Sequence, residues 1–136
     1  MPPAVALDEL SRAECLRLLR SRRVGRVAVT IAALPAVLPV NYAMLGDDIV
    51  FRTMPGTKLT AAAMNTVVAF EIDEADEATR SGWSVMVIGM AEEIVDPAEL
   101  QAAADLDLET WVDGAADHVV RVRCDRISGR RVGLPD

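Results

Sequence analysis

One short segment of the chain places a cation, hydroxyl groups and a turn in the order that an anion-binding site requires. A strand-like run ends at Arg52 and Thr53, and a Pro-Gly pair breaks it. Thr57 and Lys58 then open a helix. A helix start offers free N–H groups and the positive end of the helix dipole. A cation there is unfavourable unless a bound anion offsets its cost. The segment therefore predicts a phosphate site, with a capped helix and solvated charges as the alternative.

Lys58 is the only lysine of the 136-residue chain, whose other basic residues are 13 arginines. The formal net charge is −7, which argues against a protein that coats nucleic acid. The sign is uneven, because residues 1–60 carry +3 and residues 61–136 carry −10. The cations of the first part cluster between Arg12 and Arg26. This cluster is interpreted as a solvated helix and turn, with an anion-binding rim or a partner surface as alternatives.

Other residue types that could do chemistry are sparse. His118 is the only histidine and has no ligand pattern around it, so no metal site is predicted. Cys15 and Cys124 show no paired spacing and are expected to be reduced core thiols. The sequence shows no signal peptide and no apolar run of roughly 18–20 residues. We therefore expect a soluble, cytoplasmic protein that contacts neither membrane nor nucleic acid.

These candidate residues must be positioned by a mainly β fold with short helices. Ser11 and Glu14 form a capping box for a helix over residues 12–20. Alternating apolar residues predict six strands, and turn and cap signals predict two further helices. The strands are expected over 24–33, 37–43, 49–53, 66–72, 83–95 and 118–123, the helices over 57–64 and 97–104, and an exposed acidic loop over 73–80. Most connections are too short for parallel crossovers, which favours a small antiparallel barrel.

The chain is expected to form one domain over residues 1–136. Its parts are an N-terminal helix and arm (1–23), the barrel core (24–95), a helical insertion (96–117), and the last strand and tail (118–136).

An ordered set of motifs resembles the pyridoxamine 5′-phosphate oxidase-like family of FMN-binding split barrels, in its short bacterial branch. The set runs from Leu38-Pro39-Val40-Asn41-Tyr42-Ala43 through Phe51-Arg52-Thr53 and Gly56-Thr57-Lys58-Leu59. It continues through residues 67–73 and 82–92 and ends at 126–131. The resemblance covers roughly residues 8–131, and it rests on the order of the pieces rather than on any single one.

The resemblance implies a six-stranded split barrel that works as a homodimer, with two identical FMN sites at the subunit interface. In such proteins a lysine and nearby hydroxyls hold the FMN phosphate, and two strands approach the flavin. The corresponding phosphate residues are Arg52, Thr53, Thr57 and Lys58. The strand along the ring corresponds to Pro39, Val40, Asn41 and Tyr42, and the second strand to Trp83, Ser84 and Val85. Trp111 is a candidate to reach the flavin across the dimer.

Ser84 stands where the biosynthetic oxidase has a glutamine, and the extra C-terminal segment that binds its substrate is not expected here. Pyridoxamine phosphate oxidation itself is therefore not predicted. The leading hypothesis is a flavin-dependent oxidoreductase of unknown substrate. The alternatives are a deazaflavin-dependent reductase on the same fold, and a non-enzymatic flavin- or haem-binding or degenerate barrel. No catalytic acid or base stands out, and Tyr42 could donate a proton or simply pack.

Overall fold

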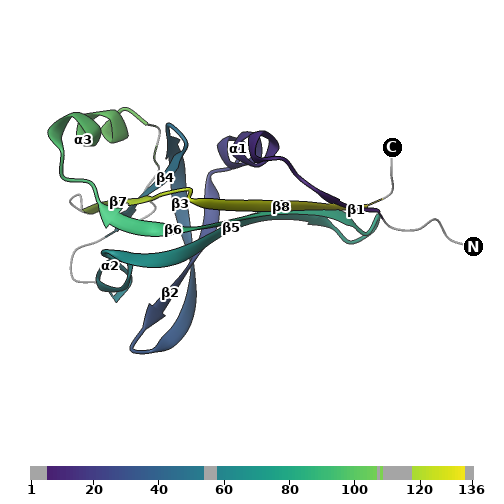
Figure 1. The fold of residues 1–136 in the computed structure, drawn as a ribbon, viewed down its shortest axis with the longest axis horizontal. Coiled ribbons are helices and arrows are strands. Elements are labelled where there is room, and N and C mark those ends of the chain that lie inside the picture. The colour runs from purple at the N-terminus through teal and green to yellow at the C-terminus, as the bar shows by residue number, and fades with distance from the viewer. Residues whose placement is uncertain (1–5, 54–57, 107, 109–117, 134–136) are drawn as a thin grey trace, which may run out of the picture.

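The structure is a computed structural model that describes residues 6–53, 58–106, 108 and 118–133. Within these residues the chain forms eight strands and three short helices, whose arrangement is drawn in Figure 1. The strands are β1 (Ala6–Glu9), β2 (Val24–Ile31), β3 (Leu34–Leu45), β4 (Asp48–Thr53), β5 (Thr66–Asp76), β6 (Ser81–Glu93), β7 (His118–Val122) and β8 (Arg126–Gly133). The helices are α1 (Arg12–Arg20), α2 (Lys58–Ala63) and α3 (Pro97–Ala104). Among the helices so described, none is long and apolar enough to cross a membrane.

Six strands close an antiparallel barrel in the order β6-β5-β2-β3-β4-β7, and β7 pairs back onto β6. β8 pairs with β6 from Gly82 to Ile88, away from the residues that pair with β7, and β1 pairs with β8. In Figure 1 the long β5–β6 hairpin, β8 and β1 extend away to the right of the barrel. This architecture confirms the predicted six-stranded split barrel with short helices.

The core lies where alternate residues of the barrel strands meet. Val27, Phe70, Val85 and Val120 are among the side chains that are fully buried there. α1 covers one end of the core with buried Leu18 and Leu19, among others. Its predicted boundaries and its capping box are confirmed, with Ser11 Oγ accepting from the Glu14 N–H at 3.1 Å.

The first β-turn differs from the prediction. Separate strands over 24–33 and 37–43 place the reversal between them, around Pro35, but Pro35 lies within β3 opposite Thr30. The chain reverses at Ala32 and Ala33, which both adopt positive φ angles of 50° and 67°. A two-residue reversal with both φ angles positive matches the twist of the flanking strands, and so it is favoured in a tight hairpin.

Two further expectations were wrong. The acidic segment 73–80 is not all loop, because β5 runs on to Asp76 and pairs there with Ser81 of β6. The segment 118–123 is not the last strand, because β8 follows it and pairs with β6 from Gly82 to Ile88. Both extensions are made by backbone pairing of largely polar residues, and the sequence carries little apolar alternation in them.

Candidate functional site

The predicted phosphate residues flank the corner between β4 and α2, where Arg52 and Thr53 end the strand and Lys58 begins the helix. β4 pairs with β3 as far as Tyr42 opposite Phe51, so Asn41 and Arg52 are the next residues along the two strands. On its other side β4 pairs with β7, and Thr53 lies opposite His118. α2 begins at Lys58. Thr57 lies outside the described residues.

Thr53 is the most informative residue of this corner. It shares its side of β4 with the core residues Ile49 and Phe51, and it is only 5% exposed. Its Oγ1 is buried and has no hydrogen-bond partner within the described part of the chain. An unsatisfied buried hydroxyl costs about 1–3 kcal/mol. A ligand oxygen at this strand end would remove that cost.

Arg52 points to the other side of β4 because side chains alternate along a strand, and it is half-buried. The hydroxyl of Thr53 and the guanidinium of Arg52 can therefore share a ligand only past the end of the strand. Lys58, at the start of α2, is the next predicted phosphate residue that the structure describes.

The strand predicted to lie along the flavin ring presents two different faces. Pro39 and Asn41 face outward, whereas Val40 packs against the core. Tyr42 is buried, and its hydroxyl donates to the Leu19 carbonyl at 2.6 Å. Its ring packs edge-on against the Phe70 ring, with the two ring centroids 4.8 Å apart. Burial raises the pKa of Tyr42 well above its usual value. The structure therefore favours the packing role of the Tyr42 side chain over proton donation.

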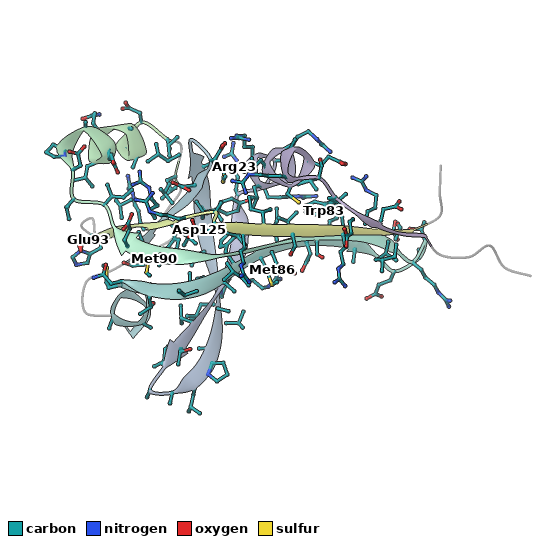
Figure 2. All side chains as sticks on the ribbon, in the orientation of Figure 1. Arg23, Trp83, Met86, Met90, Glu93 and Asp125 are labelled. Atoms are coloured by element: carbon teal, nitrogen blue, oxygen red, sulfur yellow. The ribbon has the colours of Figure 1, made fainter. Side chains whose placement is uncertain are left out.

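The second predicted strand segment lies in β6. Val85 is fully buried in the core, and Ser84 is half-buried on the outer side. Trp83, labelled in Figure 2, packs beneath the guanidinium of Arg22 at 5.3 Å, and Arg22 pairs with Glu74. The indole ring is therefore already in contact with a cation of this chain.

The two predicted strand segments do not meet within one chain. Asn41 of β3 pairs with Val24 of β2, and Ser84 of β6 pairs with Asp73 of β5. β2 and β5 are neighbours, so both strands lie between the two segments. Ser84 is thus three strand spacings from Asn41, about 14 Å along the outer surface of the sheet. Trp111, the candidate to cross the dimer, lies outside the described residues.

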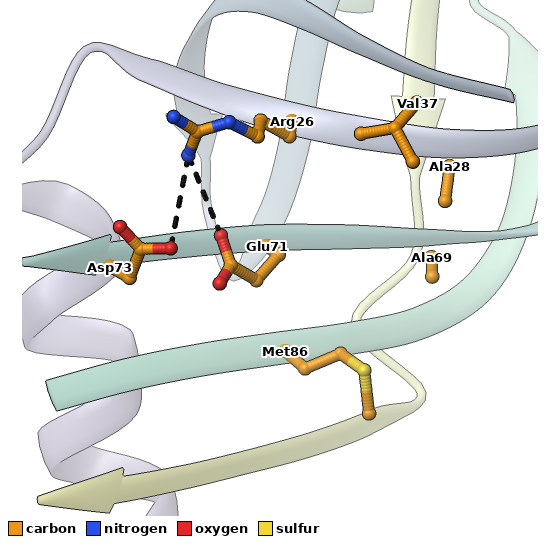
Figure 3. A pocket seen from close by; sticks show the side chains of 7 residues that line it. All are labelled: Arg26, Ala28, Val37, Ala69, Glu71, Asp73 and Met86. Carbon is orange, nitrogen blue, oxygen red and sulfur yellow. Dashed lines mark ion pairs between the residues drawn. The ribbon is translucent and has the colours of Figure 1, made fainter.

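The outer surface between these segments carries an open groove of about 330 Å³, shown in Figure 3. Ala28, Val37, Ala69 and Met86 make it largely apolar. One wall is charged, because Arg26 Nη1 lies 3.8 Å from both Glu71 Oε1 and Asp73 Oδ2.

Glu71 is a titratable residue that the sequence reasoning missed. Burial raises its pKa to about 7, the hydrogen bond and negative charge of Asp73 add to this, and Arg26 partly offsets it. Such a carboxyl holds or releases a proton near neutral pH. The available signal was the spacing of Glu71 and Asp73, which places both carboxylates on the same face of a strand.

Comparison with known proteins identifies the family to which this fold belongs. The sequence profile of the pyridoxamine 5′-phosphate oxidase family matches residues 11–131. An uncharacterised protein of Mycobacterium tuberculosis, Rv0080, is 40% identical over 129 residues, covering 91% of this chain and 84% of its own.

Two solved structures share the fold over nearly their whole length. The FAD-binding protein from Mycobacterium smegmatis superposes with a TM-score of 0.85 at 38% identity, over 94% of this chain and 100% of its own. A FAD-binding protein from Mesorhizobium loti superposes with a TM-score of 0.75 at 27% identity, over 96% and 100%. The split barrel, the match over residues 11–131 and these relatives together show that the chain belongs to the pyridoxamine 5′-phosphate oxidase family.

Proposed function

We propose that the protein binds a flavin nucleotide and holds its phosphate at the corner between β4 and α2. The observation that carries this proposal is the buried Thr53 hydroxyl without a partner among the described residues. Arg52 precedes it and Lys58 begins the next helix, so two cations lie close to it in the chain. Thr57 is the second hydroxyl of the proposed set. Hydroxyls and cations bound to phosphate oxygens form charge-assisted hydrogen bonds, which are among the strongest that proteins make.

FAD is the form of flavin that we propose first, and FMN the second. The relatives from M. smegmatis and M. loti are FAD-binding proteins. Both nucleotides carry a phosphate at the end of the same ribityl chain, so the residues of the corner can serve either.

A deazaflavin coenzyme is a weaker candidate. The acidic tail of such a coenzyme would need free cations, which the N-terminal arginine cluster could supply, but several of these arginines already pair with carboxylates of the chain. Arg20 pairs with Asp47 at 2.6 Å, and Arg26 pairs with Glu71 and Asp73. Arginines that are neutralised in this way attract an acidic ligand less.

We further propose that the flavin site is completed in a homodimer. The outward-facing residues Asn41 and Ser84 lie at separate places on one outer surface. A second copy can therefore supply one of the two predicted segments to the flavin bound by the other. The same surface exposes large apolar side chains at Val37, Val67 and Met86. Val37 and Met86 line the same groove, and exposed apolar surface of this kind is typical of protein interfaces.

Flavin-dependent oxidoreduction is the activity that we propose for the dimer. A bound flavin supplies hydride or single-electron transfer, and the protein supplies position and electrostatics. Glu71 is the residue of the outer groove that can exchange a proton near neutral pH. The Arg26 guanidinium, 3.8 Å from Glu71 Oε1, orients that carboxyl and limits the rise in its pKa.

Replacement of Lys58 tests the phosphate site. Lys58→Ala is expected to weaken FAD and FMN binding by about 1.5–3 kcal/mol, roughly a tenfold to hundredfold rise in Kd, because a charge-assisted contact is lost. The matched control is Arg17→Ala, which removes one positive charge from the exposed side of α1. Fluorescence titration measures both variants. Equal affinities for Lys58→Ala, Arg17→Ala and the parent protein would contradict the assignment.

A further inference from the structure

Three polar side chains lie at the end of the barrel where β4 ends, β7 begins and β6 ends. Each continues the row of inward-facing residues on its strand. Thr53 follows Phe51 on β4, His118 precedes Val120 on β7, and Glu93 follows Ala91 on β6. In each strand the apolar neighbour two residues away is fully buried. Because side chains alternate along a strand, the three polar residues lie on the interior side of the barrel end.

Contacts tie this group together. Thr53 and His118 are directly opposite each other in the β4–β7 ladder. The His118 Nδ1 lies 3.0 Å from Glu93 Oε1, and their side chains are 36% and 33% exposed. The Ile94 N–H donates to the Val119 carbonyl at 2.8 Å and holds the two strand ends in place. Figure 2 labels Glu93 at this end of β6.

The contact with Glu93 fixes the orientation of the His118 imidazole. A carboxylate that binds one ring nitrogen of a histidine fixes the plane of the ring and leaves the other nitrogen available to bind a ligand. Here Glu93 holds Nδ1, so Nε2 is the nitrogen left for a ligand. The neighbouring Thr53 hydroxyl is buried and unsatisfied within the described chain. An unpaired hydroxyl and an oriented imidazole that lie side by side can both donate hydrogen bonds to phosphate oxygens.

We infer that His118, positioned by Glu93, is a further contact of the phosphate of the bound flavin nucleotide, beside Thr53. This inference rests on the proposed flavin site and adds two residues to it. His118 contacts the ligand, whereas Glu93 is a positioning residue that acts through the imidazole. The ligand class is a phosphorylated flavin, and the recognised group is the phosphate on the ribityl chain rather than the ring.

Binding of riboflavin and of FMN separates the phosphate contribution from that of the ring. His118→Ala is expected to raise the Kd for FMN roughly tenfold or more, the cost of one hydrogen bond to a charged group. Its Kd for riboflavin is expected to remain that of the parent protein. Glu93→Ala should show the same selective loss, and Glu93→Gln, which keeps a hydrogen-bonding group, should recover part of it.

The matched control is Glu92→Gln. Glu92 is the neighbouring residue on β6, faces the other side, and pairs with Arg123 at 2.5 Å. Loss of the Glu92 charge should change neither the FMN affinity nor the riboflavin affinity. If His118→Ala does not fold, His118→Asn provides the same comparison.

Two results would overturn the inference. One is an unchanged FMN affinity in the folded His118 variant, and the other is an equal loss of riboflavin and FMN affinity, which indicates a structural role only. If the parent protein binds neither FMN nor FAD, the proposed function fails and the inference fails with it. That outcome is visible in the parent protein before any variant is compared.

Discussion

The Thr53 hydroxyl is a group whose removal should have opposite effects on folding and on binding. Valine has nearly the same shape but leaves no unsatisfied oxygen in the barrel. Thr53→Val is therefore expected to stabilise the unliganded protein by about 1 kcal/mol and to weaken FMN binding by a similar amount. Chemical denaturation and fluorescence titration measure the two effects. A less stable variant with unchanged affinity would mean that the hydroxyl serves the fold and not a ligand.

Glu71 makes the stability of the folded chain depend on pH. Because its pKa is raised to about 7 in the folded protein, the native state retains a proton that the unfolded chain releases at lower pH. Stability should therefore fall as pH rises from the ordinary range of a carboxyl group to about 7.

Glu71→Gln imitates the protonated acid and should remove this dependence. We expect the variant and the parent to have equal Tm at about pH 4, and the variant to have the higher Tm at about pH 8. Glu77→Gln, which alters an exposed carboxylate near the tip of the β5–β6 hairpin, is the control. Thermal unfolding across this range measures the difference. A parallel pH dependence in Glu71→Gln and the parent would contradict the raised pKa.

At the scale of elements, closure of the barrel depends on a close approach at Gly89 of β6. A Cβ atom at Gly89 would lie 1.7 Å from the Arg123 carbonyl oxygen, just beyond β7. The Arg123 N–H also donates to the Met90 carbonyl at 3.0 Å. This backbone contact leaves no room for a side chain and therefore requires a glycine.

Gly89→Ala is expected to destabilise the protein by about 1–3 kcal/mol or more, because the added methyl group forces two backbones apart. Gly46→Ala is the comparison, since Gly46 has a φ of +62° but no neighbour within 4 Å of the added Cβ. Its cost should be limited to the left-handed conformation, about 1–2 kcal/mol. Chemical denaturation ranks the two variants, and a greater loss in Gly46→Ala would contradict the role of Gly89 in closure.

The predictable elements are those whose signals are local. α1 is confirmed at both ends because its capping box and its buried leucines lie within one short segment. β8 was missed because its inward positions are Ile127 and Gly129, which make little apolar alternation. The outer part of the β5–β6 hairpin was missed because its residues are mostly exposed, and only cross-strand pairing makes them a strand.

The same distinction applies to the candidate site. Arg52, Thr53 and Lys58 are neighbours in sequence, so their order alone suggested a phosphate site. The partnership of His118 with Glu93, and the position of His118 opposite Thr53, depend on the register of three strands that are distant in sequence. The raised pKa of Glu71 likewise depends on how it is buried among neighbouring strands. The local spacing of Glu71 and Asp73 shows that they share a face of the strand, but it does not show this burial.

At the scale of the whole molecule, the outer surface of β2, β3, β5 and β6 is the proposed dimer interface. Met86 is 42% exposed near its centre, in the groove that also contains Arg26 and Glu71. Met86→Glu is expected to convert a dimer into monomers and to weaken flavin binding, because it places a charge in an apolar contact. Leu100→Glu, at a 37% exposed position of α3, is the matched control. Sedimentation measures the association, and a parent protein that is monomeric with flavin bound would contradict the dimer.

Flavin binding by the intact chain is the claim on which the other proposals rest. Its most direct test is the visible absorption spectrum of the purified protein after incubation with excess FAD, and separately with FMN, followed by gel filtration. The expected result is a flavin spectrum that travels with the protein at about one flavin per chain, with the released nucleotide identified by mass. A protein that leaves the column without flavin absorption after both incubations would contradict the claim.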